Sequence, residues 1–212
     1  MRAQATKKGD SDEALIEHLR AALTRVRPVR DLARGDHDLN PGMVSRRPLV
    51  AAAVLIPVIA AGPGPRVLFT KRALSLADHA GEISFPGGRV EPGDLDAAAA
   101  ALRESEEELG LRPSQIEILG ALDFYETRTG FRVSPLVGLL SPPLDLKPDP
   151  REVAEVLEVP LAHLLDPANH RRRDFTAGGQ ARSFYAIPFG GHTIWGATAG
   201  MLMNLCEVMR AE

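Results

Sequence analysis

The sequence predicts an α/β fold in which β-strands are mixed with a few α-helices. Three observations predict it. Apolar or alternating segments of strand length recur along the chain, glycine and proline separate them, and three stretches carry apolar residues at helical spacing. With 212 residues, the chain is long enough for one domain that buries a substantial core and carries extensions.

The N-terminal part is expected to lie outside the main domain. Residues 1–10 carry charge without a following apolar core, which favours a disordered tail over a signal peptide. From Ser11 onward, capping residue types are followed by leucines at helical spacing, and a polar stretch comes next. We therefore expect an amphipathic helix and linker over residues 11–45 and the main domain over residues 46–212.

Within the main domain, the elements follow from apolar runs and the residues that break them. Two apolar runs flank a Gly-Pro-Gly-Pro turn, and later runs end at proline or glycine. The expected strands are 50–60, 66–70, 116–122, 132–140, 152–160, 182–188 and 192–195. The expected helices are 95–109, 161–166 and 196–210, and the expected loops are 71–93 and 141–150.

Composition argues against several classes of partner. The chain has 25 basic and 28 acidic residues, a net charge of −3, so no overall field attracts nucleic acid or a membrane surface. The apolar stretch 49–62 is too short for a membrane helix, which needs roughly 20 residues. The single cysteine, Cys206, excludes an intramolecular disulfide and fits a reducing compartment. We expect a cytoplasmic protein.

The predicted helix 95–109 concentrates four glutamates in little more than one turn. At helical spacing Glu104, Glu107 and Glu108 share roughly a 100° arc, whereas Glu106 falls outside it and is expected to be solvated. Such an arc can hold a divalent cation, although a solvated acidic face is the commoner meaning of a charge run. An opposite strip is expected to be buried and consists of Ala98, Leu102, Ser105 and Leu109.

The residues around this helix resemble the Nudix hydrolases. The box of that family reads G, five residues, E, seven residues, then R-E-U-x-E-E-x-G-U, where U is apolar. The matching residues are Gly88, Arg103, Glu104, Glu107, Glu108, Gly110 and Leu111. Three positions differ: Asp94 replaces the first glutamate, one extra residue precedes Arg103, and Ser105 replaces an apolar residue. The resemblance implies a mixed β-sheet sandwiched between α-helices, an α/β/α arrangement.

In having an aspartate at position 94 and the extra residue before Arg103, the chain resembles one branch of that family, the coenzyme A diphosphatases. That branch also carries the upstream signature L-x-T-x-R, then L-x-x-H-x-G-x-x-x-F-P-G-G. The chain reads LFTKRALSLADHAGEISFPGG over Leu68–Gly88 and matches it at ten positions. The ending from Ile194 to Ala199 is also similar to that branch. The resemblance implies hydrolysis of coenzyme A or its acyl thioesters to 3′,5′-ADP and 4′-phosphopantetheine or its acyl form.

The resemblance also implies roles for the residues of the box. Glu104, Glu107 and Glu108 are expected to bind Mg²⁺ or Mn²⁺, hard cations that prefer oxygen ligands. Arg103 is expected to orient one of these glutamates, and the four residues together form the expected catalytic set. A general base from outside the box stays open among three glutamates. The candidates are Glu126, Glu152 and Glu155.

Coenzyme A presents phosphates, an adenine and a pantetheine arm, so its pocket needs basic and apolar groups. The expected substrate-binding residues are Lys71, Arg72, Gly87, Gly88 and Arg128. Arg171–Arg173 could clamp a phosphate, but a solvated basic turn is the preferred interpretation. His79 is equally consistent with a phosphate contact and with a bond to the loop backbone.

Two alternatives to the coenzyme A hypothesis stay open. One is a Nudix hydrolase of another nucleoside diphosphate derivative, such as ADP-ribose. The other is a non-catalytic Nudix-like ligand-binding module, which the retention of all three metal glutamates disfavours. The N-terminal helix fits packing on its own domain or on a second subunit, so a homodimer is open as well.

Overall fold

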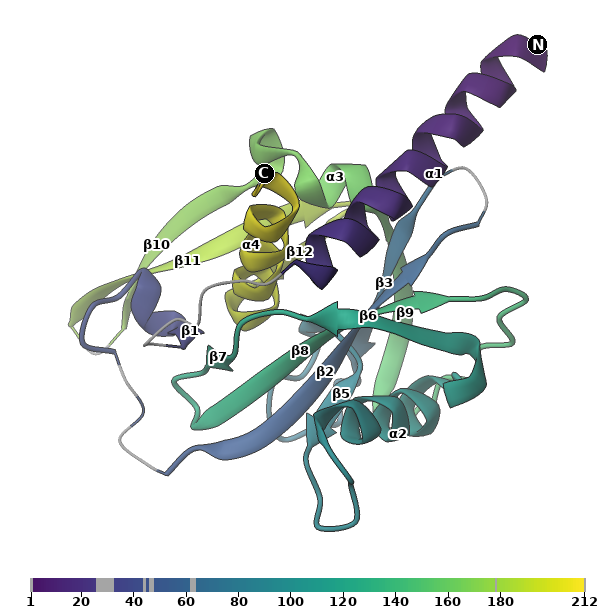
Figure 1. Cartoon of the computed structure of the whole chain (residues 1–212). Coiled ribbons are helices and arrows are strands. Elements are labelled where there is room, and N and C mark those ends of the chain that lie inside the picture. Colours follow the sequence, from purple (N-terminus) through teal and green to yellow (C-terminus); the bar gives the residue numbers. More distant parts are fainter. Residues whose placement is uncertain are drawn as a thin grey trace.

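Two β-sheets and four α-helices make up the described part of the chain (Figure 1). The computed structural model describes residues 2–25, 33–43, 45, 48–61, 64–177 and 179–211. The helices are α1 (Arg2–Thr24), α2 (Ala97–Leu109), α3 (Leu161–Leu165) and α4 (Gly196–Arg210), with short 3₁₀ helices η1 (Asp36–Asp38), η2 (Pro113–Gln115) and η3 (Pro167–Asn169). The strands are β1 (Arg34–Gly35), β2 (Val50–Ile59), β3 (Arg66–Arg72), β4 (Ile83–Ser84), β5 (Gly87–Arg89), β6 (Ile116–Ala121), β7 (Tyr125–Glu126), β8 (Phe131–Leu140), β9 (Val153–Pro160), β10 (Arg171–Ala177), β11 (Gln180–Phe189) and β12 (His192–Trp195).

The larger sheet is mixed and is built around β2. Its order is β1-β7-β8-β2-β3-β4, with β5 paired to β2, β6 to β8 and β9 to β3. The parallel β2–β8 ladder runs from the pair Val50 and Phe131 to the pair Ile59 and Leu140, whereas β3 runs antiparallel to β2 and β9. A long central strand of this kind must be covered on both faces.

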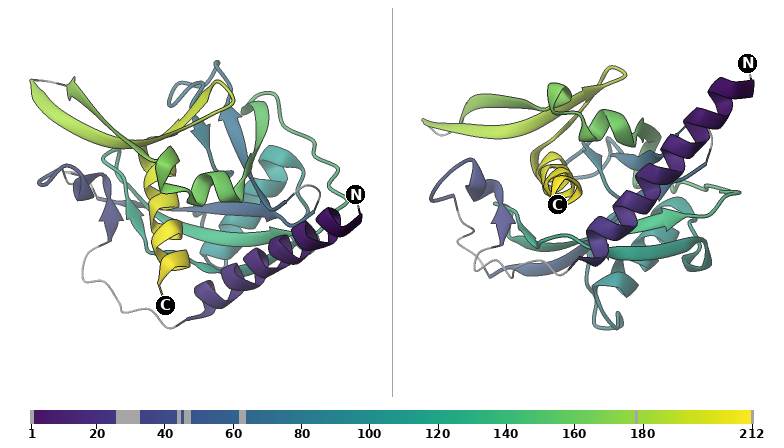
Figure 2. Two further views of the ribbon diagram at one scale, coloured as in Figure 1. Left: turned by 90° about the horizontal axis from the view of Figure 1, so that it is seen from above. Right: turned by 45° about the horizontal axis from the view of Figure 1, so that its top comes forward.

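Helices cover both faces of the larger sheet, with α2 on one and α1 and α4 on the other (Figures 1 and 2). Alternate residues of β2 pack toward opposite sides because successive side chains of a strand point to opposite faces. The α2 side buries Ala53, Leu55, Ala100 and Ala101, and the opposite side buries Ile56, Val58, Leu19 and Leu202. This is the α/β/α arrangement expected from the sequence, and the expected fold is confirmed.

The smaller sheet is antiparallel, in the order β10-β11-β12. Its inner face packs on α4, where Ile187 of β11 and Ile194 of β12 are buried in the main core. Its other face is turned away from the helix. Helix α4 therefore lies between the two sheets (Figure 2).

Several expected boundaries differ from the structure. Helix α1 begins at Arg2, so residues 2–10, expected to be a disordered tail, are helical. Strand β1 and η1 lie within the expected linker, of which residues 26–32, 44, 46 and 47 fall outside the described residues. Strands β4 and β5 lie within the expected loop 71–93. In the described chain, no helix is long and apolar enough to cross a membrane.

Candidate active site

Both ends of α2 are fixed by local chemistry. Asp96 is the N-cap, and its carboxylate accepts a hydrogen bond of 2.8 Å from the backbone N–H of Ala99. Gly110 ends the helix in the left-handed region, with φ 70°, and its N–H donates to the carbonyl of Glu106 at 2.8 Å. The helix predicted from the charge run is confirmed, and its glutamates hold fixed positions beside the larger sheet.

Packing separates the four glutamates of α2 into two pairs. Glu106 and Glu107 are exposed, whereas Glu104 is half-buried and Glu108 is only 4% exposed. The prediction of a buried strip on α2 was partly wrong, because Ala98 and Leu102 are only half-buried. The fully buried residues of α2 are Ala100, Ala101, Ser105, Glu108 and Leu109. One carboxylate of the expected metal-binding arc, that of Glu108, is therefore buried.

Two consecutive glycines of β5 make room for the buried carboxylates. A Cβ at Gly88 would lie 2.5 Å from Cδ of Glu104, and a Cβ at Gly87 would lie 2.6 Å from Cα of Val54. Gly87 has φ 153°, and its N–H points at Oε1 of Glu108 across 3.5 Å. Gly88 thus lets β5 approach α2 this closely, and Gly87 lets β5 approach β2.

Burial makes ionisation of these carboxyls costly. Desolvation, with smaller contributions from the charges of Glu104 and Glu152, raises the pKa of Glu108 to about 8, against opposing effects of the Gly87 N–H and Arg72. Desolvation also raises the pKa of Glu104 above its usual value. The site is therefore one that a cation would stabilise, because the cation would offset the cost of the buried negative charge.

Arg103 joins the helix to the loop that precedes it. Its Nε and Nη2 donate to the two carboxylate oxygens of Asp94 at 3.1 Å each, and Nη1 donates to Glu104 at 2.9 Å and to Glu107 at 3.3 Å. Asp94 in turn accepts a hydrogen bond of 2.8 Å from the N–H of Glu91. These bonds to Arg103 hold the pKa of Asp94 below its usual value. The aspartate that departs from the general Nudix box thus anchors the arginine.

Of the three candidate bases, the structure brings one to the buried carboxylates. The charge of Glu152 raises the pKa of both Glu104 and Glu108, and its carbonyl accepts a hydrogen bond from Ala73 just beyond β3. Glu155 is instead paired with Lys71 at 3.4 Å and with a histidine of β12. Glu126 lies in β7, which pairs with β1 and β8.

Arg72 is the expected substrate-binding side chain that reaches this cluster. Its charge lowers the pKa of Glu108, which places the two groups within electrostatic reach. Within the described structure, its Nε is buried without a hydrogen-bond partner. A buried donor of this kind is costly unless it meets an acceptor, such as a phosphate oxygen.

One other expected contact, Arg128, lies elsewhere, and His79, whose role was left open, bonds to a neighbouring side chain. Arg128 is exposed in the turn after β7, beyond the Val50 end of β2, while Gly87 pairs with β2 four residues further along. At about 3.3 Å per residue this separation is roughly 13 Å, so Arg128 is not brought into the cluster. His79 has φ 58°, and its Nδ1 is bonded to Oε2 of Glu82 at 2.9 Å.

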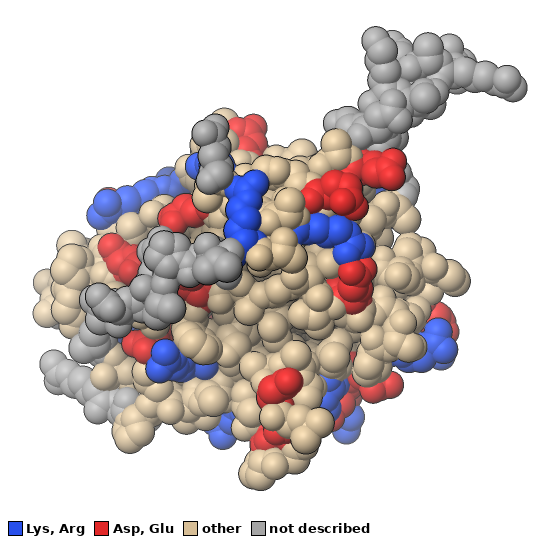
Figure 3. Space-filling model, viewed as in Figure 1, with Lys and Arg blue, Asp and Glu red and all other residues tan. Residues whose placement is uncertain are grey.

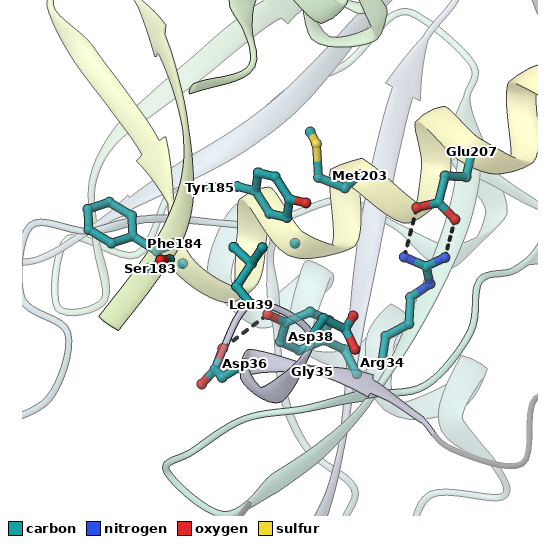
Figure 4. A pocket seen from close by; sticks show the side chains of 13 residues that line it. Arg34, Gly35, Asp36, Asp38, Leu39, Ser183, Phe184, Tyr185, Met203 and Glu207 are labelled. Atoms are coloured by element: carbon teal, nitrogen blue, oxygen red, sulfur yellow. Dashed lines mark hydrogen bonds and ion pairs between the residues drawn. The ribbon is translucent and has the colours of Figure 1, made fainter. Parts of the chain in front are cut away.

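A cavity of about 270 Å³ lies on the α4 side of the larger sheet, and no sequence pattern indicated it (Figure 4). Arg34 of β1 pairs there with Glu207 of α4, and the Tyr125 hydroxyl donates to Asp36 at 3.0 Å. Asp38 adds a further carboxylate to the lining. Its only arginine is already paired, so this cavity is poorly suited to phosphate. The residues come from segments far apart in the chain, so spacing could not have revealed it.

The donor chemistry of the α2 cluster fits a hard divalent cation, since Glu104 and Glu108 offer carboxylate oxygens in a partly desolvated place and the exposed Glu152 acts on both. In the described residues, no three acidic, histidine or cysteine side chains converge closely enough to hold a metal ion as they stand. The assignment of Glu104, Glu107 and Glu108 as metal ligands therefore stays a prediction.

Comparison with known proteins places the chain in a family. The model of the NUDIX domain matches residues 49–178. An uncharacterized Nudix hydrolase, NudL of Photorhabdus laumondii, is 40% identical over 156 residues, which cover 74% of this chain and 83% of the relative. NudL of Escherichia coli K12 is 39% identical over 154 residues, which cover 73% and 80%.

A solved structure agrees at the level of the fold. The Nudix hydrolase RenU of M. smegmatis superposes with a TM-score of 0.54 at 19% identity, over 78% of this chain and 91% of that one. The family model covers more than half of the chain, and the NudL relatives extend the match over about three quarters of it. The chain therefore belongs to the Nudix hydrolases and hydrolyses the diphosphate bond of a nucleoside diphosphate derivative.

Proposed function

We propose that this Nudix hydrolase cleaves the diphosphate bond of coenzyme A or acyl-coenzyme A. The products are 3′,5′-ADP and 4′-phosphopantetheine or its acyl form. One observation carries the proposal: the signature Leu68–Gly88, similar to the coenzyme A branch, spans most of β3 and all of β4 and ends in Gly87 and Gly88 of β5, directly beside the carboxylates of Glu104 and Glu108. The residues that resemble the branch are thus the residues that border the candidate catalytic site.

Glu104 and Glu108 are the proposed principal ligands of Mg²⁺ or Mn²⁺, metals that Nudix hydrolases generally use, with Glu107 as a third. When bound, such a cation neutralises phosphate charge and makes hydroxide available near neutral pH. The protein supplies a desolvated position in which both carboxylates gain from a cation. Glu107 is exposed and would have to exchange its bond with Arg103 to take part.

Arg103 and Asp94 are proposed to hold Glu104 in position. The guanidinium is fixed by both carboxylate oxygens of Asp94 and by a bond to the Arg89 carbonyl at 3.1 Å. With those bonds in place, the Nη1 bond of 2.9 Å to Glu104 sets where that carboxylate points. Residues that orient a ligand in this way typically affect metal affinity or activity about 10- to 100-fold.

Glu152 is the proposed proton acceptor for the attacking water. It is the one of the three candidate glutamates whose charge acts on both Glu104 and Glu108. It also precedes β9 at the point where that strand pairs with Arg72 of β3. The proposed acceptor Glu152 and the proposed substrate-binding Arg72 therefore lie at the same end of the β3–β9 ladder.

Arg72 is the proposed contact for a diphosphate oxygen, because its buried Nε has no partner among the described residues. Lys71, half-buried next to it and 3.4 Å from Glu155, is proposed to add a second positive charge. Gly87 and Gly88 are proposed to let the substrate approach the backbone. Arg128 remains a proposed contact for a more distant part of the substrate. The cytoplasmic location and the homodimer remain proposals drawn from the sequence.

Product analysis with a substrate panel tests the proposal. Coenzyme A, acetyl-coenzyme A, 3′-dephospho-coenzyme A and ADP-ribose are supplied at equal concentration with Mg²⁺ and with Mn²⁺, and products are separated by chromatography. We expect the first two to be cleaved fastest, with 3′,5′-ADP among the products. Equal rates for coenzyme A and its dephospho form would contradict the proposed substrate, and preferential cleavage of ADP-ribose would support the alternative.

A further inference from the structure

The outer face of the smaller sheet collects aromatic and basic side chains from β10 and β11 and the end of β12. Because successive side chains of a strand alternate between faces, Arg171, Arg173 and Phe175 of β10 lie on one face. Their partners across the ladder are Ala186, Phe184 and Arg182 of β11. The strand pairing thus places arginines and aromatic rings on the face turned away from α4.

Three rings form a continuous row across this face. Phe175 and Phe184 have their centroids 5.5 Å apart, and Phe184 and Trp195 have theirs 5.4 Å apart, both pairs edge to face. Phe175 is 44% exposed and Trp195 is 39% exposed, although both are large apolar side chains. The cost of leaving such rings in water makes this row a candidate contact surface.

The arginines of the same face have no acidic partners in the described structure. No ion pair joins Arg171, Arg173 or Arg182 to a carboxylate there, and Nε of Arg182 is buried without a hydrogen-bond partner. Asp174, the acid of β10, instead accepts a hydrogen bond from the Ser183 hydroxyl. The same hydroxyl accepts a hydrogen bond from Arg172. Figure 3 shows basic side chains at the upper left of the molecule, where Figure 1 places β10.

Part of this face forms one shallow hollow of about 580 Å³. Its lining includes Arg171, Arg173, Phe175 and Phe184, together with the acid Asp174. We propose that this face binds single-stranded nucleic acid, with bases stacking on the exposed rings and phosphates bonding to the arginines. A single-stranded nucleic acid requires rings on which its unstacked bases can stack and basic groups that bind its phosphates. The aromatic row and the arginines of this sheet offer both.

A single-stranded nucleic acid fits this face better than a single nucleotide or a second copy of the chain does. The row spans two successive ring-to-ring steps, so it offers more stacking surface than one base covers. A second copy would bring the same three arginines against this face or close to it, at a cost in charge repulsion. A polyanion complements the charge at every arginine.

This proposal revises the expectation that nucleic acid is not a partner. That expectation rested on the net charge of −3, which describes the whole chain. Binding depends on the local charge, and many of the acids that balance the total lie on other elements, including the four glutamates of α2. The inference is independent of the proposed coenzyme A substrate.

Intrinsic fluorescence offers a direct probe because Trp195 is the only tryptophan of the chain. The full-length protein is titrated with a ten-nucleotide single strand, and quenching is compared with that by AMP and by a ten-unit abasic phosphodiester. We expect saturable quenching by the strand, at least ten-fold weaker binding of AMP, and binding of the abasic chain without comparable quenching. Affinity for the strand should fall as salt is raised.

Two variants localise the binding to this face. Phe175→Ser should weaken binding about 5- to 150-fold, the range expected for the loss of one stacked base. Arg173→Glu should weaken it and reduce its dependence on salt, whereas the matched change Arg112→Glu, at an exposed arginine before η2, should alter neither. All three variants should keep the wild-type diphosphatase rate, which also shows that they are folded.

Several outcomes would overturn the proposal. They are the absence of saturable quenching, equal affinities for AMP and the strand, and equal losses in the Arg173 and Arg112 variants. Sedimentation provides a further test: if Phe175→Ser or Arg173→Glu converts a dimer to a monomer without changing strand affinity, the face is an interface between two copies. Failure of this proposal leaves the diphosphatase assignment untouched, because the substrate panel tests that separately.

Discussion

Replacing Glu108 by glutamine should stabilise the metal-free protein, and the gain should increase with pH. The carboxyl is 4% exposed, and desolvation raises its pKa from 4.5 to about 8. Between these two pH values the unfolded chain releases the proton while the folded protein keeps it. The stability of the wild-type protein therefore falls as pH rises through this window, and a neutral amide escapes the loss.

The magnitude follows from the size of the pKa change at Glu108. At 1.36 kcal/mol for each pKa unit, the carboxyl destabilises the folded protein by about 1 kcal/mol at pH 5 and about 4 kcal/mol at pH 8. The advantage of the glutamine variant should therefore grow by about 3 kcal/mol between the two pH values. Glutamine has nearly the same shape and its carbonyl can accept the Gly87 N–H, so little packing is lost.

Urea unfolding in the presence of a chelator at pH 5, 6.5 and 8 measures this difference. Groups other than Glu108 titrate in both proteins, so their contributions cancel when the free energies of unfolding are subtracted. Glu106→Gln, an exposed change on the same helix, is the control and should show no comparable pH-dependent gain. Excess Mg²⁺ should then stabilise the wild-type protein at pH 8 by about 2.7 kcal/mol at 100 times its Kd, and the Glu108 variant by less.

Two results would refute this reasoning. If the stability difference between wild type and Glu108→Gln stayed constant from pH 5 to pH 8, the buried carboxyl would not carry the proposed cost. If the wild-type protein gained stability relative to the variant as pH rose without metal, an unrecognised cationic partner would be holding Glu108 ionised.

Three further predictions concern the same site. Asp94→Asn should loosen Arg103 and lower Mn²⁺ affinity about 10- to 100-fold, measured by calorimetric titration, whereas a purely structural role would change stability alone. Gly88→Ala should abolish most turnover while circular dichroism stays near wild type, because the new Cβ would collide with the Glu104 carboxylate; unchanged kinetics would mean that this close approach is unimportant. Glu152→Gln should lower kcat about 10²- to 10⁴-fold with little change in KM, and a wild-type pH–rate profile in that variant would exclude it as the base.

The elements that local chemistry determines were predictable from the sequence. The acidic helix was expected over residues 95–109 and is found over Ala97–Leu109, because a capping aspartate and Gly110 fix its ends within a few residues. The α/β/α fold also followed, since it was implied by the resemblance to the Nudix hydrolases. In both cases the deciding residues are neighbours in the chain.

The remaining features depend on contacts between distant segments. A helical projection groups Glu104 with Glu108 but cannot tell which of them becomes buried when α2 packs on β2, a strand some fifty residues earlier. Three consecutive arginines suggested a basic turn at 171–173, and this interpretation was wrong, because pairing with β11 makes them the start of β10. Strand β1 was missed for the same reason, since it forms only against β7.

Manganese binding coupled to turnover tests the central claim most directly. Mn²⁺ affinity, followed by electron paramagnetic resonance, and hydrolysis of coenzyme A are measured for wild type, Glu104→Gln, Glu108→Gln and the exposed control Glu106→Gln. We predict that the control matches wild type and that the other two lose at least ten-fold in Mn²⁺ affinity together with most of their turnover. Wild-type affinity and turnover in both Glu104→Gln and Glu108→Gln would contradict the assignment of these buried carboxylates as the metal-binding centre.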